Sequence, residues 1–393
     1  MQVSGGHLKS IAILGRAILA GAAVFAWSTP AAGQRAPPWL VGELDLVHDD
    51  QPRTALHAHL EYGRFLGPYI TLSLGLDAAR VIADAPLALG AQGSSGESQT
   101  APGPETTTLV PRLGGTLAIP ALRLGLSASA GGLLGAPTGS GTAGTEVPIL
   151  WETGANVRIG PSTFLQLEAS QEHYTWTMAS IDTLLLMQSF VVAVDRAAAP
   201  GWAGRLSLGL ESFGDDNPIR SAYAWILAPL HRSESRSLRV GYSASYRHAE
   251  RSNWVPAGGT HRGPGESSGL GPLGILSPDG SIPGQYAPYY TPQELSIHSA
   301  VVAVAQSMGS GWLKLDGAVG IHATEQAPVL WPTPAGPSQY QLQFHEHSFR
   351  PYRLEVSWSM PLAGSTSLTV GGDYNRTAFY GAGRVRLALS RSL

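Results

Sequence analysis

Apolar and polar residues alternate along most of the chain beyond residue 38. In one segment Ile70, Leu72, Leu74 and Leu76 occupy every second position, with small or polar residues between them. A period of two residues is typical of β-strands that have one apolar and one polar face. The same pattern recurs at intervals up to the C-terminus, so it predicts an all-β fold.

The predicted strands are long. Several reach about 10–13 residues, whereas strands of soluble proteins average about 5–6 residues and transmembrane strands need about 9–11. A soluble β-sandwich and a membrane β-barrel both alternate in this way, and strand length favours the barrel. We expect about sixteen strands, near 39–48, 54–63, 68–78, 107–119, 121–131, 146–158, 161–172, 182–195, 203–213, 219–230, 237–248, 293–306, 311–323, 350–361, 366–376 and 380–391.

Aromatic residues near the strand ends support the membrane barrel. Outer-membrane barrels carry aromatic girdles where the wall meets the two lipid interfaces. The residues expected there are Trp39, Tyr62, Tyr69, Trp151, Trp225, Trp312, Tyr352, Trp358, Tyr374 and Tyr380.

The connections between the predicted strands alternate in length. Short connections at 64–67, 159–160, 307–310 and 362–365 follow even-numbered strands. Long connections near 79–106, 249–292 and 324–349 follow odd-numbered strands. Outer-membrane barrels have short periplasmic turns and long extracellular loops, so we expect the long connections to be extracellular. An even strand number places both termini on the periplasmic side.

These features predict a transmembrane antiparallel β-barrel in the bacterial outer membrane, formed by residues 34–393. Its apolar face would contact outer-membrane lipid, and about sixteen strands would leave an aqueous lumen. The polar face would form a hydrated path for a solute, or its charges would only solvate the wall and pair across strands. The charged or histidine positions predicted to face the lumen are Glu43, Asp45, His57, His59, Glu61, Asp77, Arg112, Arg123, Glu152, Arg158, Glu168, Arg205, Glu211, Arg220, Arg239, Arg247, Lys314, Asp316, Arg353, Glu355, Asp373, Arg384 and Arg386.

The N-terminus has the features of a secretory signal. Lys9 and Arg16 precede an apolar run at 17–27, and small residues follow at 31–33. The run of about 11 residues is shorter than the ~20 that a membrane-spanning helix needs. We therefore expect residues 1–33 to be a cleaved signal peptide.

The composition of the chain excludes several classes of function. Charged residues make up 13% of the chain, against about 25% in ordinary soluble domains. There is no cysteine, which excludes disulfides, thiolate metal sites and a cysteine nucleophile. The net charge is −3 and no strong basic cluster is present, so we expect no nucleic-acid partner.

Three short patterns resemble catalytic or metal sites, but their contexts do not fit. Residues 265–269 match G-x-S-x-G within a Gly- and Pro-rich loop rather than a strand–turn–helix. His345 and His347 are not spaced to share one face of a helix, and His57 and His59 share a strand face without an evident third ligand. We expect no enzyme activity, no catalytic residues, no metal and no cofactor.

One region is similar to a known family. The segment 284–293 contains Tyr289-Tyr290-Thr291-Pro292-Gln293 at the entry to a strand, and Trp312, Leu315, Gly317 and Gly320 follow in the next strand. These motifs resemble the C-terminal outer-membrane β-barrel domain of cellulose synthase operon protein C and related exopolysaccharide-export porins. The resemblance is best over about 237–325. It implies a sixteen-stranded barrel and passive export of a polysaccharide, with a cellulose-like β-glucan as the first choice.

The resemblance implies a set of candidate residues along the glycan path. They are Tyr289, Tyr290, Pro292, Gln293, Trp312, Lys314, Asp316, Arg239 and Arg247. Pro292 also suits a strand start, where its missing N–H is tolerated, and the tyrosines also suit an interfacial anchor. Two other functions stay open, a general or solute-specific porin and a structural or adhesive barrel.

The chain also departs from that family. Family members usually carry helical tetratricopeptide repeats, and no repeat of the expected ~34 residues stands in this sequence. The expected partners are therefore outer-membrane lipid, the polysaccharide and a separate periplasmic repeat protein of a synthase complex.

Overall fold

The computed structural model describes residues 37–49, 53–83, 105–135, 147–181, 184–197, 201–256, 280–282, 284–333, 336–377 and 381–393. The predicted signal peptide and the G-x-S-x-G pattern at 265–269 lie outside them. The strands are β1 (Trp39–Asp49), β2 (Arg53–Phe65), β3 (Ile70–Ala83), β4 (Glu105–Ile119), β5 (Leu124–Gly132), β6 (Ile149–Arg158), β7 (Thr163–His173), β8 (Leu186–Ala197), β9 (Ala203–Ser212), β10 (Ile219–Arg232), β11 (Arg236–Ala249), β12 (Trp254–Pro256), β13 (Gly284–Tyr286), β14 (Leu295–Met308), β15 (Gly311–Thr333), β16 (Gly336–Phe349), β17 (Tyr352–Pro361), β18 (Thr366–Arg376) and β19 (Gly381–Ser392).

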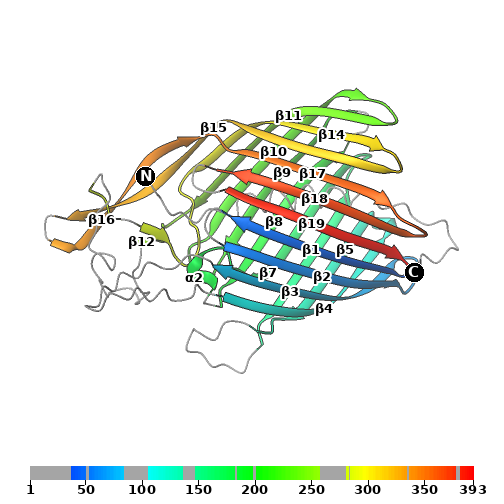
Figure 1. Cartoon of the computed structure of the whole chain (residues 1–393), viewed down its shortest axis with the longest axis horizontal. Helices are drawn as coiled ribbons and strands as arrows, with labels where there is room; N and C mark the ends of the chain where they lie inside the picture. The colour runs from blue at the N-terminus through cyan, green and yellow to red at the C-terminus, as the bar shows by residue number, and fades with distance from the viewer. Residues whose placement is uncertain are drawn as a thin grey trace, which may run out of the picture.

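The large sheet closes into a barrel (Figure 1). Each wall strand pairs antiparallel with the next, and β19 returns to pair with β1 from Trp39 opposite Ser392 to Asp49 opposite Ala382. Closure pairs the backbone groups that an open sheet edge would expose to hydrocarbon, which is the condition for crossing a bilayer with strands.

The wall has sixteen strands, as predicted. β15 is long enough to pair with two successive strands on its return side, with β17 near its start and with β16 beyond residue 322. β16 and β17 therefore occupy one position in the wall. The β15–β16 hairpin projects past the ends of the other strands (Figure 1). We name this projecting part, residues 323–349, the rim hairpin.

The rim hairpin replaces most of the long connection expected at 324–349. Pro328 and Pro332 favour a loop in the sequence, yet both lie within β15. A proline lacks the N–H that a central strand needs. Beyond Thr324, however, β15 no longer pairs with β14, because the last pair between the two strands is Ser296 opposite Thr324. This side of β15 is therefore an edge. At an edge, the missing donor costs no ladder hydrogen bond.

The two faces of the wall differ in chemistry. Leucines such as Leu74 and Leu208 point outward and expose 57% and 58% of their surface, forming the belt that lipid would cover. The positions between them point into the lumen and carry the charged residues. Opposite-charge pairs such as Arg386 with Asp45 identify this inner face.

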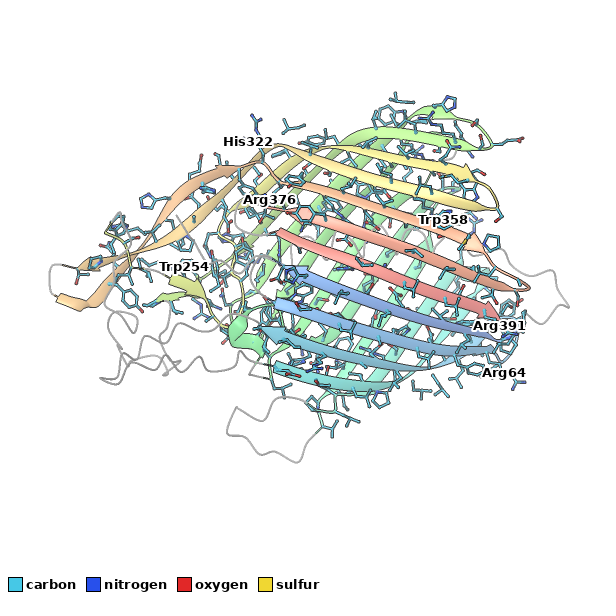
Figure 2. The ribbon with its side chains drawn as sticks, viewed as in Figure 1. Arg64, Trp254, His322, Trp358, Arg376 and Arg391 are labelled. Carbon is cyan, nitrogen blue, oxygen red and sulfur yellow. The ribbon has the colours of Figure 1, made fainter. Side chains whose placement is uncertain are left out.

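The two ends of the barrel also differ. Short turns close one end, including the 3-10 helix η2 (Pro120–Leu122), and both described termini meet there, with the N–H of Leu393 donating to the carbonyl of Pro38 at 2.7 Å. At the opposite end lie the rim hairpin, the strands β12 and β13 and the short helix α2 (Met178–Ile181). In Figure 2, Trp254 lies at this loop end, and Arg64 and Arg391 lie at the turn end. No helix within the described ranges is long and apolar enough to cross a membrane.

Candidate functional site

All but two of the charged or histidine positions predicted to face the lumen do so. Arg123 is the C-cap of η2 in a turn, with φ of 52°, and is not on the wall. Arg220 lies on the outer face, because it stands opposite Leu210 and His248, and it pairs with Glu250 at 2.6 Å. The outward neighbour Ile226 confirms the phase of this strand, being 47% exposed.

Most charges on the inner wall are arranged in pairs. Arg386 of β19 reaches both Glu43 and Asp45 of β1, at 2.7 and 2.9 Å. His59 and Arg112 both bind Asp77 of β3, the histidine at 2.5 Å. Further pairs are Arg353 with Glu355, Arg384 with Asp373 at 3.6 Å and Arg205 with Asp195 at 3.1 Å. Pairing across and along the strands holds these side chains against the wall and reduces the field that a solute would meet.

Several aromatic side chains of the described wall also face the lumen, and two of them lie on β10. Trp225 lies opposite Arg205 and Ser243, and Tyr223 lies opposite Ser207 and Ser245, all on the inner face. Trp225 is therefore not in the aromatic girdle, as its sequence position near a strand end had suggested. The phase of the alternation in 219–230, set by Ile226 rather than by Trp225, is the signal that would have placed it correctly.

The loop end of the lumen is occupied by the chain itself. We name residues 174–181, which leave β7 and include α2, the crossing segment. Ile181 is fully buried against Val47, Ala55, Val81 and Ala83, which are inner-face residues of β1, β2 and β3. The crossing segment thus extends from β7 over the mouth to the wall formed by β1, β2 and β3.

Arg53 at the start of β2 fixes the crossing segment there. Its guanidinium pairs with Asp49 at 2.9 Å, donates to the carbonyl of Thr175 at 2.7 Å and lies 4.6 Å above the ring of Trp176. Trp176 in turn packs against Ala382 of β19. A buried arginine with a carboxylate, a carbonyl and an aromatic face has partners for most of its donors.

A second segment packs on the first. We name residues 284–294, which lead into β14, the return segment. Tyr289 stacks on Phe213 with ring centroids 3.7 Å apart and contacts Tyr174 edge-to-face. Thr177 donates to the carbonyl of Pro288, and the N–H of Tyr290 donates to the hydroxyl of Tyr174 at 3.4 Å. Gly284 is needed because a Cβ there would overlap the indole of Trp254.

The motif tyrosines are buried in this packing. Tyr289 and Tyr290 are 1% and 3% exposed, and their hydroxyls donate to Asp215 and Glu325 respectively. Burial, and for Tyr289 the hydrogen bond to Asp215, raises the pKa of both phenols. In this conformation the ring faces contact protein and the hydroxyls are neutral donors to carboxylates.

Glu325 is a titratable group of the mouth whose pKa is shifted toward neutral pH. It lies beyond the last β14–β15 pair and is 2% exposed. Burial raises the pKa of its carboxyl from 4.5 to about 7, against the opposing effects of the Tyr290 hydroxyl and the Arg247 charge. Below it, Arg247 and Glu211 form a buried ion pair at 2.7 Å.

The structure divides the predicted site residues into two groups. Tyr289, Tyr290, Pro292, Gln293 and Arg247 come together at the mouth, where the carbonyls of Pro292 and Gln293 accept from Ala249 and Gln326. The other predicted residues lie on the inner wall of β11 and β15, namely Arg239, Trp312, Lys314 and Asp316. Within the described part of the chain, no group of three or more His, Cys, Asp or Glu could hold a metal ion.

Known proteins share the fold but little sequence. No protein-family model matches the chain, and no curated protein matches it. A bacterial polysaccharide outer membrane secretin aligns with a TM-score of 0.58 and 8% identity, over 92% of this chain and 99% of that chain. OccK8 (OprE) of Pseudomonas aeruginosa aligns at 0.41 and 8%, over 91% and 98% of the two chains. The CymD monoaromatic hydrocarbon channel aligns at 0.39 and 10%, over 92% and 89%.

The secretin alignment establishes the fold, and the apolar outer belt establishes what surrounds it. A closed barrel whose exterior leucines are exposed and whose interior is charged is stable in a bilayer and not in water. The chain is therefore a sixteen-stranded transmembrane β-barrel of the bacterial outer membrane.

Proposed function

We propose that this barrel is a channel that exports an exopolysaccharide, with a cellulose-like β-glucan as the preferred cargo. The observation that carries the proposal is the inner wall, where most charges are paired with one another and aromatic residues such as Tyr223, Trp225 and Trp312 face the lumen. Paired charges offer hydrogen bonds without a strong field, which suits an uncharged, hydroxyl-rich polymer. Aromatic faces bind sugar rings weakly enough to allow sliding.

Two further points support this cargo. The motif around Tyr289 and Trp312 resembles polysaccharide-export porins, and a structural neighbour that aligns over 92% of this chain is described as a bacterial polysaccharide outer membrane secretin. Transport needs no catalytic group in the barrel. The proposal implies docking of a separate periplasmic repeat protein at the turn end, where the short turns and both described termini lie.

The mouth must open for a polymer to pass. The crossing segment and the return segment lie across the loop end. The crossing segment is held mainly by side-chain contacts, and the return segment is held by side-chain contacts, by a few backbone hydrogen bonds and by the short β12–β13 pairing. We propose that they move aside together during export. Contacts such as Ile181 against the β1–β3 wall would separate, and the wall itself would keep its pairing.

A porin for small solutes is the second candidate. A sixteen-stranded wall with a charged lumen is also suited to diffusion of small solutes. The two functions differ in their response to a soluble glycan. An export path binds oligosaccharides along the lumen, and a general porin conducts ions regardless of them.

Single-channel conductance in a planar bilayer tests the proposal. The wild type would be compared with Ile181→Asp, which introduces a charge into an apolar contact and detaches the crossing segment, and with Ile181→Val as the matched control. We expect low conductance for the wild type and Ile181→Val and a large increase for Ile181→Asp. Cello-oligosaccharides should block that current in a concentration-dependent way.

Each outcome separates the candidates. Current in Ile181→Asp that is indifferent to cello-oligosaccharides would favour the general porin. If Ile181→Asp inserts correctly, as judged by circular dichroism, and still carries no current, the barrel is structural. Block that weakens in Trp225→Ala, but not in the lipid-facing control Tyr242→Ala, would support the lumen path.

A further inference from the structure

The lumen-facing row of the return strand continues beyond the barrel. Arg353 and Glu355 of β17 face the lumen, and every second position before them leads through Phe349 to His347 and His345 of β16. The register confirms the phase, because His347 stands opposite Glu325, which points inward to the hydroxyl of Tyr290. The inner surface of the wall thus extends along the rim hairpin.

The chemistry of this row changes where it leaves the barrel. Inside the lumen it carries an arginine and a glutamate that pair with each other. On the rim hairpin it carries His347, His345, Gln343 and Gln341, and all four side chains are exposed. Amides and imidazoles both donate and accept hydrogen bonds, which matches the hydroxyl groups of a sugar better than an ion.

An aromatic side chain stands beside the row. Trp331 of β15 is directly opposite Gln341, on the same face, and is half-buried. Six residues of strand separate Gln341 from His347, a distance of about 20 Å at the usual rise per residue. A tryptophan beside a linear row of amides and imidazoles offers both a stacking face and hydrogen bonds to an extended chain of several sugar rings.

We infer that this face of the rim hairpin is a carbohydrate-binding surface that receives the polymer as it leaves the lumen. The surface comprises Trp331, Gln341, Gln343, His345 and His347. The inference rests on the proposed export function and adds to it a second glycan site outside the membrane. Its continuity with the lumen face is the argument for a glycan rather than another protein as the occupant.

Binding of cellohexaose to the full barrel chain in detergent micelles, measured by calorimetry, tests the inference. The variants are Trp331→Ala and the double variant Gln341→Ala, Gln343→Ala. The matched control is Glu346→Gln with Ser348→Ala, which alters exposed side chains on the opposite face of the same strand. We expect each surface variant to weaken binding roughly tenfold, equal to about 1.4 kcal/mol, and the control to leave binding unchanged.

A lumen experiment separates this inference from the proposed function. The same variants, combined with Ile181→Asp, should conduct normally in the bilayer and still be blocked by cello-oligosaccharide, because the lumen is unaltered. If cello-oligosaccharide blocks the current but binding in micelles does not depend on the surface variants, the inference is overturned and the export channel stands. Absence of cellohexaose binding by the wild type, together with absence of block in Ile181→Asp, would overturn both.

A second copy of the chain is the other occupant that the test can reveal. The outer edge of β16 pairs with no other described strand, so two hairpins could pair edge to edge. Sedimentation of the micellar protein would then show a dimer. A dimer that is unaffected by cellohexaose, together with unchanged affinity in the surface variants, would reject the glycan surface.

Discussion

The wall and the mouth of this barrel are built from the same chain by different means. Each wall strand pairs with the next wall strand along the chain, except that β15 pairs with both β16 and β17 and that β1 closes the barrel on β19. Contacts at the mouth join distant parts of the chain, as in the bonds from Thr177 to Pro288, Tyr290 to Tyr174 and Arg53 to Thr175, which span 111, 116 and 122 residues. The wall depends on a repeated pattern, and the mouth depends on particular residues.

This difference has an energetic consequence. Each wall strand contributes a similar ladder of hydrogen bonds and a similar apolar face, so single lumen substitutions change little. The mouth excludes water from ionised and hydroxyl groups, and each of these needs a specific partner. Substitutions should therefore have large effects at the mouth and small effects at exposed polar sites.

The largest effect is expected for the buried ion pair beneath the mouth. Glu211→Ala leaves the guanidinium of Arg247 buried without its carboxylate, because the two side chains are only 3% and 5% exposed. Breaking such a pair lowers the free energy of unfolding by about 3–5 kcal/mol. Urea unfolding of the barrel in lipid vesicles would measure it.

The exposed pair Arg220–Glu250 near the same end provides the control. Glu250→Ala should cost less than about 1 kcal/mol, because both side chains remain in water. Equal losses for Glu211→Ala and Glu250→Ala would show that burial does not distinguish the mouth from the surface.

The next largest effect is expected at the lipid face of the wall. Leu74→Arg places a charge on the lipid-facing side of β3 and should lower the free energy of unfolding by about 2–4 kcal/mol. Ser245→Arg, on the lumen face of β11, is the control and should cost far less, since its charge stays in water. A similar loss for both variants would contradict the assignment of the two faces.

The mouth should also respond to pH through Glu325. The folded pKa of about 7 exceeds the ordinary 4.5, so the folded state holds a proton that the unfolded segment loses. The attachment of the return segment should therefore be strongest below pH 4.5 and weaken by about 1–3 kcal/mol as pH rises to 7 and above. Tyr290, Tyr286, Arg247 and His347 are the titratable or charged groups around it.

Hydrogen exchange of residues 284–294, corrected for intrinsic rates, would follow this change. Glu325→Gln keeps an acceptor for Tyr290 and removes the proton equilibrium, so its protection should be independent of pH in this range. If protection still depends on pH in Glu325→Gln, another group is responsible for the effect.

The smallest effect is expected for one bond between the two mouth segments. Thr177→Val removes the hydroxyl that donates to the carbonyl of Pro288 and should weaken their contact by about 1 kcal/mol. Brief openings in single-channel records should become about fivefold more frequent. Thr153→Val, at an exposed wall position, should leave the openings unchanged.

The strands of the wall and their two faces could be predicted from the sequence, because the wall of the barrel separates lipid from water. A strand in a barrel must present one face to lipid and the other to water, so position within the alternation identifies strands such as β3 and β9. The prediction from the sequence is wrong for Arg220 and Trp225, which lie on the outer and inner face of β10 respectively. The outward position of Ile226 sets the phase of this strand and decides both.

The alternation along the chain is enough to predict the strand number, the closed all-β wall and the faces of most strands, because a pleated strand placed between lipid and water must alternate at every second residue. The tertiary structure adds that the crossing and return segments meet across the mouth, that Tyr289 and Tyr290 are buried in this state, and that residues 324–349 form a hairpin. The meeting of the two segments depends on contacts between residues more than 100 positions apart, and the burial of the tyrosines also depends on Asp215 and Glu325. Such contacts follow shape and partner chemistry rather than any period in the chain.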